Sequence, residues 1–264
     1  MVTVLLVVFG FFAGMLGALT GIGGGVLLTP ILALHFGVPI RQAIGTSLVA
    51  VITTSAASSS VHLQRHTTDI RLGMTLELAT SLGAAVMAYL VGYFNRSVLE
   101  GLFVAFLLYS SFTILRSGGK LKSDEDSAML SVNGEIPPYE AQRYPLGLSA
   151  SLVAGALSGL LGIGGGPIKV PVMFIFMNVP LMVATATSNF MIGVTAAASA
   201  IVYYRRGDIQ VEIAAPLAVG VFLGSLLGAR MAPRVQTKVV VYLLVAVMLY
   251  LATHLGVHLL REVL

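Results

Sequence analysis

Two stretches that read GIGGG interrupt the most hydrophobic parts of the chain, at 21–25 and again, 141 positions later, at 162–166. Successive glycines weaken a helix, because each costs about 1 kcal/mol relative to alanine, and they permit positive φ angles. The helix that restarts after each stretch would present free N–H groups and a positive dipole end, which bind anions. The candidate binding residues are the last three glycines of each stretch: Gly23, Gly24, Gly25, Gly164, Gly165 and Gly166.

A Thr-Ser pair is the second repeated element, and it occurs at the same 141-residue offset. Hydroxyl and amide groups can donate hydrogen bonds to substrate oxygens as water is removed. Alternatively, these hydroxyls bond to carbonyl groups of their own helix or of a neighbouring helix, which is common in apolar surroundings. The candidates are Thr46, Ser47, Thr187, Ser188 and Asn189, the last of which has Leu48 as its counterpart.

Lys169 is the one basic residue inside a hydrophobic run, three positions after the second glycine stretch, where the first copy has Leu28. An ionisable residue in such a place is a functional candidate by default. Its ammonium could pair with an anionic substrate, or its pKa could change when the substrate binds. The alternative is that its long stem carries the ammonium to an interface.

Several other chemistries are excluded by the residue pattern. Neither glycine stretch continues into GK[ST] or completes G-x-G-x-x-G, so no nucleotide-binding loop is predicted. The chain has no cysteine, and His254 and His258 lie four residues apart without a third metal ligand in sight. The hydrophobic runs contain no carboxylate pair or Ser–His pair. We therefore expect neither an enzyme, nor a metal site, nor a cofactor.

The composition predicts an integral membrane protein. The chain is 57% hydrophobic and only 10% charged, whereas soluble domains carry about a quarter charged residues. The charges gather between long apolar runs, as in proteins embedded in a lipid bilayer. A formal charge of +4 then indicates basic loops beside anionic lipid rather than a nucleic-acid surface.

The apolar runs predict an all-α polytopic fold built from two homologous halves. Each half would contain one glycine-broken helical segment and three transmembrane helices. The predicted division is a first repeat at 1–115, a polar linker at 116–145 and a second repeat at 146–264. The predicted runs are 2–20, 26–38, 43–63, 73–94, 98–115, 146–161, 167–177, 181–204, 210–229 and 236–260.

The two halves align without gaps over some fifty residues. Besides the glycines and the Thr-Ser pairs, Pro30 matches Pro171 and Arg65 matches Arg206 at the offset of 141. Internal repeats in a polytopic protein are typical of secondary transporters, whose site lies between two like halves.

The topology of the halves depends on the glycine segments. If each crosses the membrane once, the halves are parallel; if each is a re-entrant hairpin, the halves are inverted. Lys and Arg outside these segments divide nine to five in both cases, with the linker on the richer side, and we therefore expect a cytoplasmic linker. We favour the inverted repeat, because it brings the two glycine turns together from opposite faces. Run 2–20, about 28 Å long as a helix, is long for half a hairpin.

These motifs resemble the TauE/SafE family of sulfite and organosulfonate exporters. The resemblance rests on the G-x-G-G-G runs, each followed by proline five residues on, on the Thr-Ser pairs, and on Arg-Gly-Asp-Ile at 206–209. It implies a multi-pass secondary carrier in the cytoplasmic membrane of a prokaryote, which exports a small sulfur-containing oxyanion, with protons as candidate coupling ions.

Other functions remain open at this point. An anion channel would use the same helix termini, and a carrier of another small solute or of a cation is a further alternative. A cation carrier would usually need an intramembrane carboxylate, for which Glu77, Glu100 and Glu212 lie close to predicted run ends. Gly220, Gly224 and Gly228 form a small-residue ridge that predicts helix packing, either within the protomer or across a homodimer.

Overall fold

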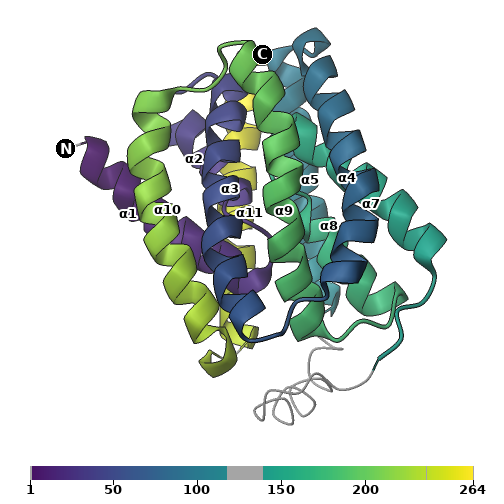
Figure 1. Ribbon diagram of the computed structural model, residues 1–264. Coiled ribbons are helices and arrows are strands. Elements are labelled where there is room, and N and C mark those ends of the chain that lie inside the picture. Colours follow the sequence, from purple (N-terminus) through teal and green to yellow (C-terminus); the bar gives the residue numbers. More distant parts are fainter. Residues whose placement is uncertain (1, 118–138, 236, 264) are drawn as a thin grey trace.

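The computed structural model describes residues 2–117, 139–235 and 237–263 of the chain. All regular secondary structure in this part is helical, and the helices pack into a bundle (Figure 1). The predicted all-α fold is therefore confirmed. Eight of the described helices are long and apolar enough to cross a membrane, as judged by length and composition alone.

The helices follow the apolar runs of the sequence. The first half contains α1 (Val2–Thr20), α2 (Gly25–His35), α3 (Ile40–Gln64), α4 (Ile70–Leu90), the 3-10 turn η1 (Val91–Tyr93) and α5 (Arg96–Ser117). The second half contains α7 (Tyr144–Leu161), α8 (Gly166–Pro171), the π-helical η3 (Val172–Phe176), α9 (Leu181–Arg205), α10 (Val211–Met231), the 3-10 turn η4 (Ala232–Arg234) and α11 (Thr237–Val263). Each helix of one half has a counterpart in the other, so α1 corresponds to α7, α3 to α9, α4 to α10 and α5 to α11.

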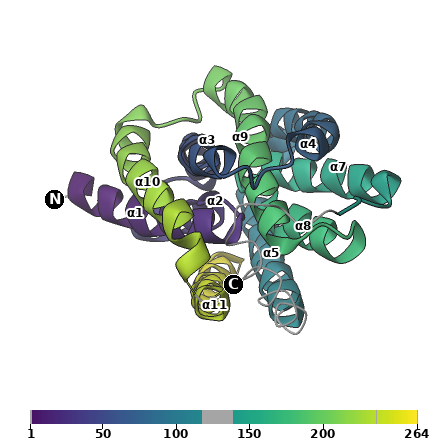
Figure 2. The same ribbon diagram turned by 60° about the horizontal axis from the view of Figure 1, so that its bottom comes forward.

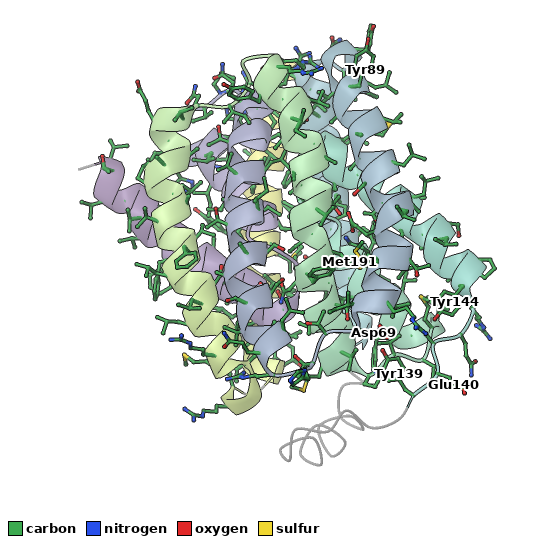
Figure 3. All side chains as sticks on the ribbon, viewed as in Figure 1. Asp69, Tyr89, Tyr139, Glu140, Tyr144 and Met191 are labelled. Atoms are coloured by element: carbon green, nitrogen blue, oxygen red, sulfur yellow. The ribbon has the colours of Figure 1, made fainter. Side chains whose placement is uncertain are left out.

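Most of the predicted linker, residues 118–138, lies outside the described residues. Its described end contacts the start of α4, where Asp69 caps the helix by accepting a hydrogen bond from the Leu72 N–H. The Tyr139 hydroxyl donates to the Asp69 carboxylate, and Figure 3 shows the two residues together at one end of α4, with Tyr89 at the other end. Burial, followed by this hydrogen bond, raises the pKa of Tyr139.

The outward faces of the helices are apolar. Leu78 and Leu82 on α4 are 77% and 62% exposed, and Val219 on α10 is 57% exposed. Side chains of this kind are favourable against lipid and unfavourable against water. The fold therefore presents the surface expected of a membrane-embedded bundle.

The glycine ridge of α10 packs against α1 inside the protomer. A Cβ added at Gly220, Gly224 or Gly228 would collide with the backbone of Val7, Phe11 or Met15, respectively. Glycine is therefore required for this close approach. Because the residue numbers rise together along both helices, α1 and α10 run parallel. The ridge is thus used within the chain and gives no support to a homodimer.

The same packing recurs between α7 and α4, which are the counterparts of α1 and α10. A Cβ at Gly155 would collide with Thr80, and one at Gly159 would collide with Ala84, so these helices also run parallel. In each case a helix of one half packs most extensively on a helix of the other half. The two halves are therefore interlocked rather than placed side by side (Figure 2).

The central pair, α3 and α9, runs antiparallel. A Cβ at Gly45 would lie 3.1 Å from the Tyr203 ring, near one end of both helices, whereas Gly193 faces Ser55 near the other. Residue numbers along the two helices therefore change in opposite senses. Figure 2 shows this pair between the α1–α10 pair and the α4–α7 pair.

Polar contacts show how α10 and α4 are directed relative to the central helices α3 and α9. Thr46 near the start of α3 bonds to Gln210, which immediately precedes α10. Arg65, which immediately follows α3, bonds to Arg230 near the end of α10, so α3 and α10 run parallel. The corresponding contact of Thr187 with Asp69 and that of Thr195 with Glu77 show that α9 and α4 run parallel. Helices α1, α3 and α10 therefore run in one direction, and their counterparts α7, α9 and α4 run in the other.

We expect the ridge contacts to contribute measurably to stability. Gly224→Ala should lower the thermal unfolding midpoint of the purified protein in detergent, because overpacking of this kind costs about 1–3 kcal/mol. Gly256→Ala is the matched control, since its Cβ would meet only a Val104 methyl group at 3.9 Å. The control should be neutral or stabilising. Equal midpoints for the two variants would contradict the proposed role of the ridge.

Candidate functional site

Both GIGGG stretches form tight turns that only glycine adopts easily. Positive φ angles occur at two glycines of the first turn and three of the second: Gly21 at 70°, Gly23 at 82°, Gly162 at 69°, Gly164 at 87° and Gly165 at 78°. This region of backbone conformation is costly for residues that carry a Cβ. The glycine runs therefore specify turns, not merely weak helices.

Each turn reverses the chain into a short helix. Thr29 on α2 bonds to Ser47 on α3, and Gly24 faces Thr54 farther along α3, so α2 runs antiparallel to α3 and hence to α1. In the second half, Gly147 faces Met177 and Gly165 faces Ala154, so the α8–η3 segment runs antiparallel to α7. The α1–α2 and α7–α8 segments are thus helical hairpins with glycine turns at their tips.

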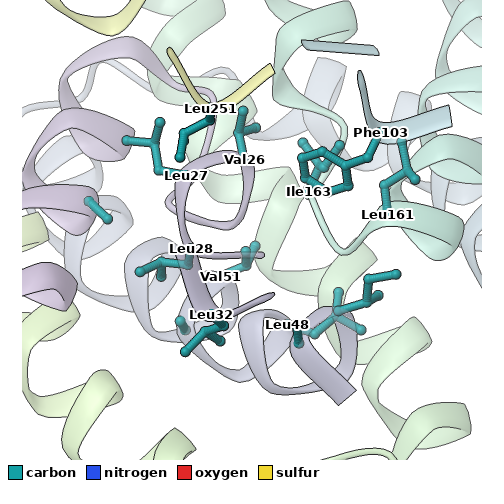
Figure 4. Close-up of a cluster of buried hydrophobic side chains, with 14 of the residues drawn as sticks. Val26, Leu27, Leu28, Leu32, Leu48, Val51, Phe103, Leu161, Ile163 and Leu251 are labelled. Atoms are coloured by element: carbon teal, nitrogen blue, oxygen red, sulfur yellow. The ribbon is translucent and has the colours of Figure 1, made fainter. Parts of the chain in front are cut away.

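The two turns contact each other between the halves. A Cβ on Gly25 would collide with the Gly162 carbonyl oxygen, and a Cβ on Gly166 would collide with the Gly21 carbonyl oxygen. Two of the glycines that the sequence singled out therefore let the backbones approach within van der Waals distance. Apolar side chains such as Val26, Ile163 and Val51 surround the contact (Figure 4), so it lies in a region of low dielectric.

The serines of the repeated Thr-Ser pairs join each turn to the opposite half. The Ser188 hydroxyl donates to the Gly21 carbonyl at 2.8 Å, and Ser47 Oγ lies 3.2 Å from the Gly162 carbonyl oxygen. Ser47 also bonds to Thr29 Oγ1 at 2.7 Å. Ser188 therefore satisfies a turn carbonyl that lipid could not satisfy, whereas Ser47 shares its one hydrogen between the Gly162 carbonyl and the nearer Ile44 carbonyl of its own helix, at 2.8 Å.

The threonines of these pairs bond to the chain just before α10 and α4. Thr46 Oγ1 accepts the Gln210 N–H at 3.1 Å, and Thr187 Oγ1 accepts the Asp69 N–H at 3.0 Å. Gln210 and Asp69 are the residues that immediately precede the two helices. In this conformation the four hydroxyls thus have protein partners, and those partners follow the repeat.

Asn189 is buried and only partly satisfied. Its Nδ2 donates to the Ala18 carbonyl at 3.0 Å, close to the first glycine turn. Its Oδ1 has no hydrogen-bond partner among the described atoms. An acceptor left free in this way can receive a hydrogen bond from water or from a protonated ligand.

Lys169 is buried in the protein and does not reach an interface. Its ammonium lies 3.6 Å from the Glu77 carboxylate and 3.3 Å from Thr195 Oγ1, with both charged side chains almost fully buried. Sequence reasoning placed Glu77 near a run end and did not pair it with Lys169. The only available signal was Lys169 itself, because a buried ammonium requires a counter-ion.

The helices α2 and α8 begin at the turns, with Gly24 and Gly165 as their N-caps. Helix geometry leaves the first N–H groups without an intrahelical acceptor, and in α2 these belong to Gly25 and Val26. In α8 the corresponding donor is Gly166, because Pro167 has no N–H. Positive dipole ends and free donors therefore come together where the two turns touch.

A cavity of about 100 Å³ lies beside this point. Its lining includes Thr20 and Ile22 at the first turn, Pro167 at the start of α8, and Thr185 near the start of α9. Lys169 is not among the lining residues, since it lies on a different face of α8. Gly25, Val26 and Gly166 are not among the lining residues either, so the cavity lies next to the backbone donors without containing them, and its walls are mostly apolar.

Comparisons with known proteins agree with this architecture. Residues 6–255 match the family described as "Sulfite exporter TauE/SafE". The probable membrane transporter protein YunE of Bacillus subtilis is 30% identical over 236 residues, which cover 83% of this chain and 84% of that protein. A probable membrane transporter protein of Methanocaldococcus jannaschii is 28% identical over 234 residues, covering 82% and 81% of the two chains.

A further relative from Bacillus subtilis, the probable membrane transporter protein YdhB, is 24% identical over 210 residues, which cover 80% of this chain and 82% of that protein. No solved structure gave a significant match. The family and these relatives are membrane transporters rather than enzymes. With its repeated hairpins and its match over nearly the whole length, the chain belongs to the TauE/SafE family of membrane transporters.

Proposed function

We propose that this transporter carries sulfite or a small organosulfonate-type anion out of the cytoplasm by alternating access. The observation that carries the proposal is the meeting of two glycine turns, each followed by a helix N-terminus, beside a cavity between the halves. The description of the family as sulfite exporters supports the class of substrate.

The anion would be held by backbone N–H groups. Donors at Gly25, Val26 and Gly166 replace part of its hydration, and the dipoles of α2 and α8 add to the attraction. A hydrogen bond to a charged group contributes about 1.5–3 kcal/mol. A few such bonds bind an anion without holding it too tightly to release. Ser47, Ser188 and the paired threonines would reach the anion only after their present hydrogen bonds open.

The alternating mechanism is supported by the opposite directions of corresponding helices. Such directions are expected of an inverted repeat, in which each half reproduces the other from the opposite side of the membrane. The hairpins then enter from opposite sides, and their tips meet midway. The linker would be cytoplasmic by the positive-inside rule, and the location we propose is the cytoplasmic (inner) membrane of a prokaryote, which the bacterial and archaeal relatives support.

The two ends of the described bundle differ at one clear pair of equivalent positions. Thr185, which lines the cavity, is partly exposed, whereas Ile44, 141 positions away in the other half, is fully buried. We take this conformation as one of two related states. In the other state, the cavity at the linker end would close and the equivalent cavity would open opposite.

Each moving body would contain helices from both halves. Because α1 packs on α10 through backbone contacts and α4 packs on α7 in the same way, these pairs separate less easily than α3 and α9. The expected bodies are therefore α1–α3–α10 and α4–α7–α9. They would rock about the α3–α9 contact, and the glycine turns would move with them.

The contribution of one backbone donor can be isolated with Val26→Pro. Proline fits the first turn of a helix, and Pro167 already occupies the equivalent position in the second half. The substitution removes one N–H, so we expect sulfite to bind about tenfold more weakly in calorimetry of the purified protein.

Val26→Ala is the matched control, because it also changes the side chain but keeps the N–H. It should bind sulfite as the unmodified protein does if both variants keep similar unfolding midpoints. Equal affinities for the proline and alanine variants would exclude the Val26 N–H from the site.

Cysteine labelling can test the change of access, because the natural chain contains no cysteine. In vesicles, Thr185→Cys should react with a membrane-impermeant thiol reagent from the linker side, whereas Ile44→Cys should be protected. Sulfite turnover should slow the first reaction and expose Ile44→Cys to reagent from the opposite side. If sulfite leaves both labelling rates unchanged while it is transported, alternation at these positions is contradicted.

A further inference from the structure

A buried ionic cluster lies beside the second glycine turn, formed by Lys169 on α8, Glu77 on α4 and Thr195 on α9. The Lys169 ammonium lies 3.6 Å from Glu77 Oε2 and 3.3 Å from Thr195 Oγ1, while Thr195 Oγ1 donates to Glu77 Oε1 at 2.7 Å. The Ser81 hydroxyl also donates to Glu77 Oε1, at 2.6 Å. Three helices from both halves therefore supply the cluster.

The ion pair is close but incompletely bonded. Glu77 Oε2, the oxygen that faces Lys169, has no hydrogen-bond partner among the described atoms. A buried ion pair costs several kcal/mol per ion in desolvation, which its attraction repays only with good geometry and additional hydrogen bonds. Among the described atoms, Glu77 Oε2 is therefore held by the charge of Lys169 alone, and only another anion beside Lys169 could take its place without leaving a buried ammonium unpaired.

The cluster departs from the repeat. Most polar contacts of the turns occur twice, but the charges of this cluster occur once. The positions 141 residues away from Lys169, Glu77 and Thr195 are Leu28, Ala218 and Thr54. Two halves that pack alike can do so without these charges, so the scaffold does not require them.

Lys169 is well placed to receive the transported anion. It lies in the first turns of α8, and its Cε is 3.3 Å from the point that a Cβ on Gly165 would occupy. The ammonium is thus a neighbour of the second glycine turn. It lies on a different face of α8 from the cavity, so the anion would reach it when the hairpin moves.

We propose that Lys169 exchanges Glu77 for the anion, and that Glu77 then takes up a proton, so that one proton travels with each anion. This rests on the proposed function. The resting pair is neutral. When the anion replaces the carboxylate beside the ammonium, Glu77 becomes an unpaired buried charge, and a proton from water on the open side neutralises it. The loaded site then carries no uncompensated charge from the pair.

The groups that face this pair leave Glu77 as the proton acceptor. Lys169 is faced by Glu77 from α4, by Thr195 from α9 and by the Ala154 backbone beside Gly165 from α7. Among the described residues, Glu77 pairs with Lys169 and accepts hydrogen bonds from Thr195 and Ser81. Hydroxyl groups do not titrate in the physiological range, so the carboxylate is the group that can gain the proton.

The test measures sulfite and proton movement together in proteoliposomes that hold a trapped pH indicator. Each variant is compared with the unmodified protein at the same pH. Protons that sulfite itself binds or releases then contribute equally to both proton counts, and the difference reports the protein. Glu77→Gln should move one proton fewer per sulfite, and its sulfite flux should become sensitive to membrane potential. Lys169→Met should weaken sulfite binding at least tenfold.

Glu100→Gln is the matched control, because Glu100 on α5 is a buried carboxylate that pairs with Arg96. It should keep the proton count of the unmodified protein. If Glu77→Gln folds poorly, the double variant Glu77→Gln/Lys169→Met is used in its place, because it leaves no charge in the cluster. Infrared difference spectra should then show a carboxylic-acid band on sulfite addition in the unmodified protein and in Glu100→Gln, but not in the double variant.

An unchanged proton count in Glu77→Gln, or a retained carboxylic-acid band in the double variant, would overturn this inference while leaving sulfite transport intact. An unmodified protein that moves no sulfite would instead overturn the proposed function, and this inference with it. The two failures are therefore distinguishable.

Discussion

Backbone groups at membrane depth must find partners within the protein, and the rest of this structure depends on that constraint. Each glycine turn interrupts helical hydrogen bonding where lipid offers no replacement. The Gly21 carbonyl accepts a hydrogen bond from Ser188 of the opposite half, and the Gly162 carbonyl lies 3.2 Å from Ser47 Oγ, whose hydrogen it shares with the Ile44 carbonyl. The first N–H groups of α2 and α8 have no acceptor within their own helices, and they are the donors of the anion site that we propose. One constraint therefore produces both the contact between the halves and the proposed anion site.

The repeated scaffold and the unrepeated residues have different roles. Contacts that recur at the 141-residue offset, such as Thr46 with Gln210 and Thr187 with Asp69, position equivalent helices in both halves. Residues without a polar counterpart give the molecule its asymmetry, and Lys169 is the clearest of these. Symmetry lets a transporter reach two similar states, and the unrepeated charges of Lys169 and Glu77 carry the coupling to protons that we propose.

Sequence periodicity predicted the helices well, because each apolar run is long enough to specify its own secondary structure. The glycine repeat also identified both hairpin tips. It did not reveal that the Thr-Ser hydroxyls bond to protein groups of the opposite half, since that depends on which helices become neighbours. Likewise Glu77 and Lys169 lie far apart in sequence, and no local pattern links them. The roles assigned to the site residues remain predictions.

The location of the anion can be measured with selenite, the heavier analogue of sulfite, whose selenium gives an anomalous X-ray signal. A crystal of the protein soaked with selenite should show a selenium peak between the two turns, within hydrogen-bond distance of the N–H groups of Gly25, Val26 or Gly166. A peak only at arginine-bearing loops, from a crystal of protein that transports selenite, would contradict the account.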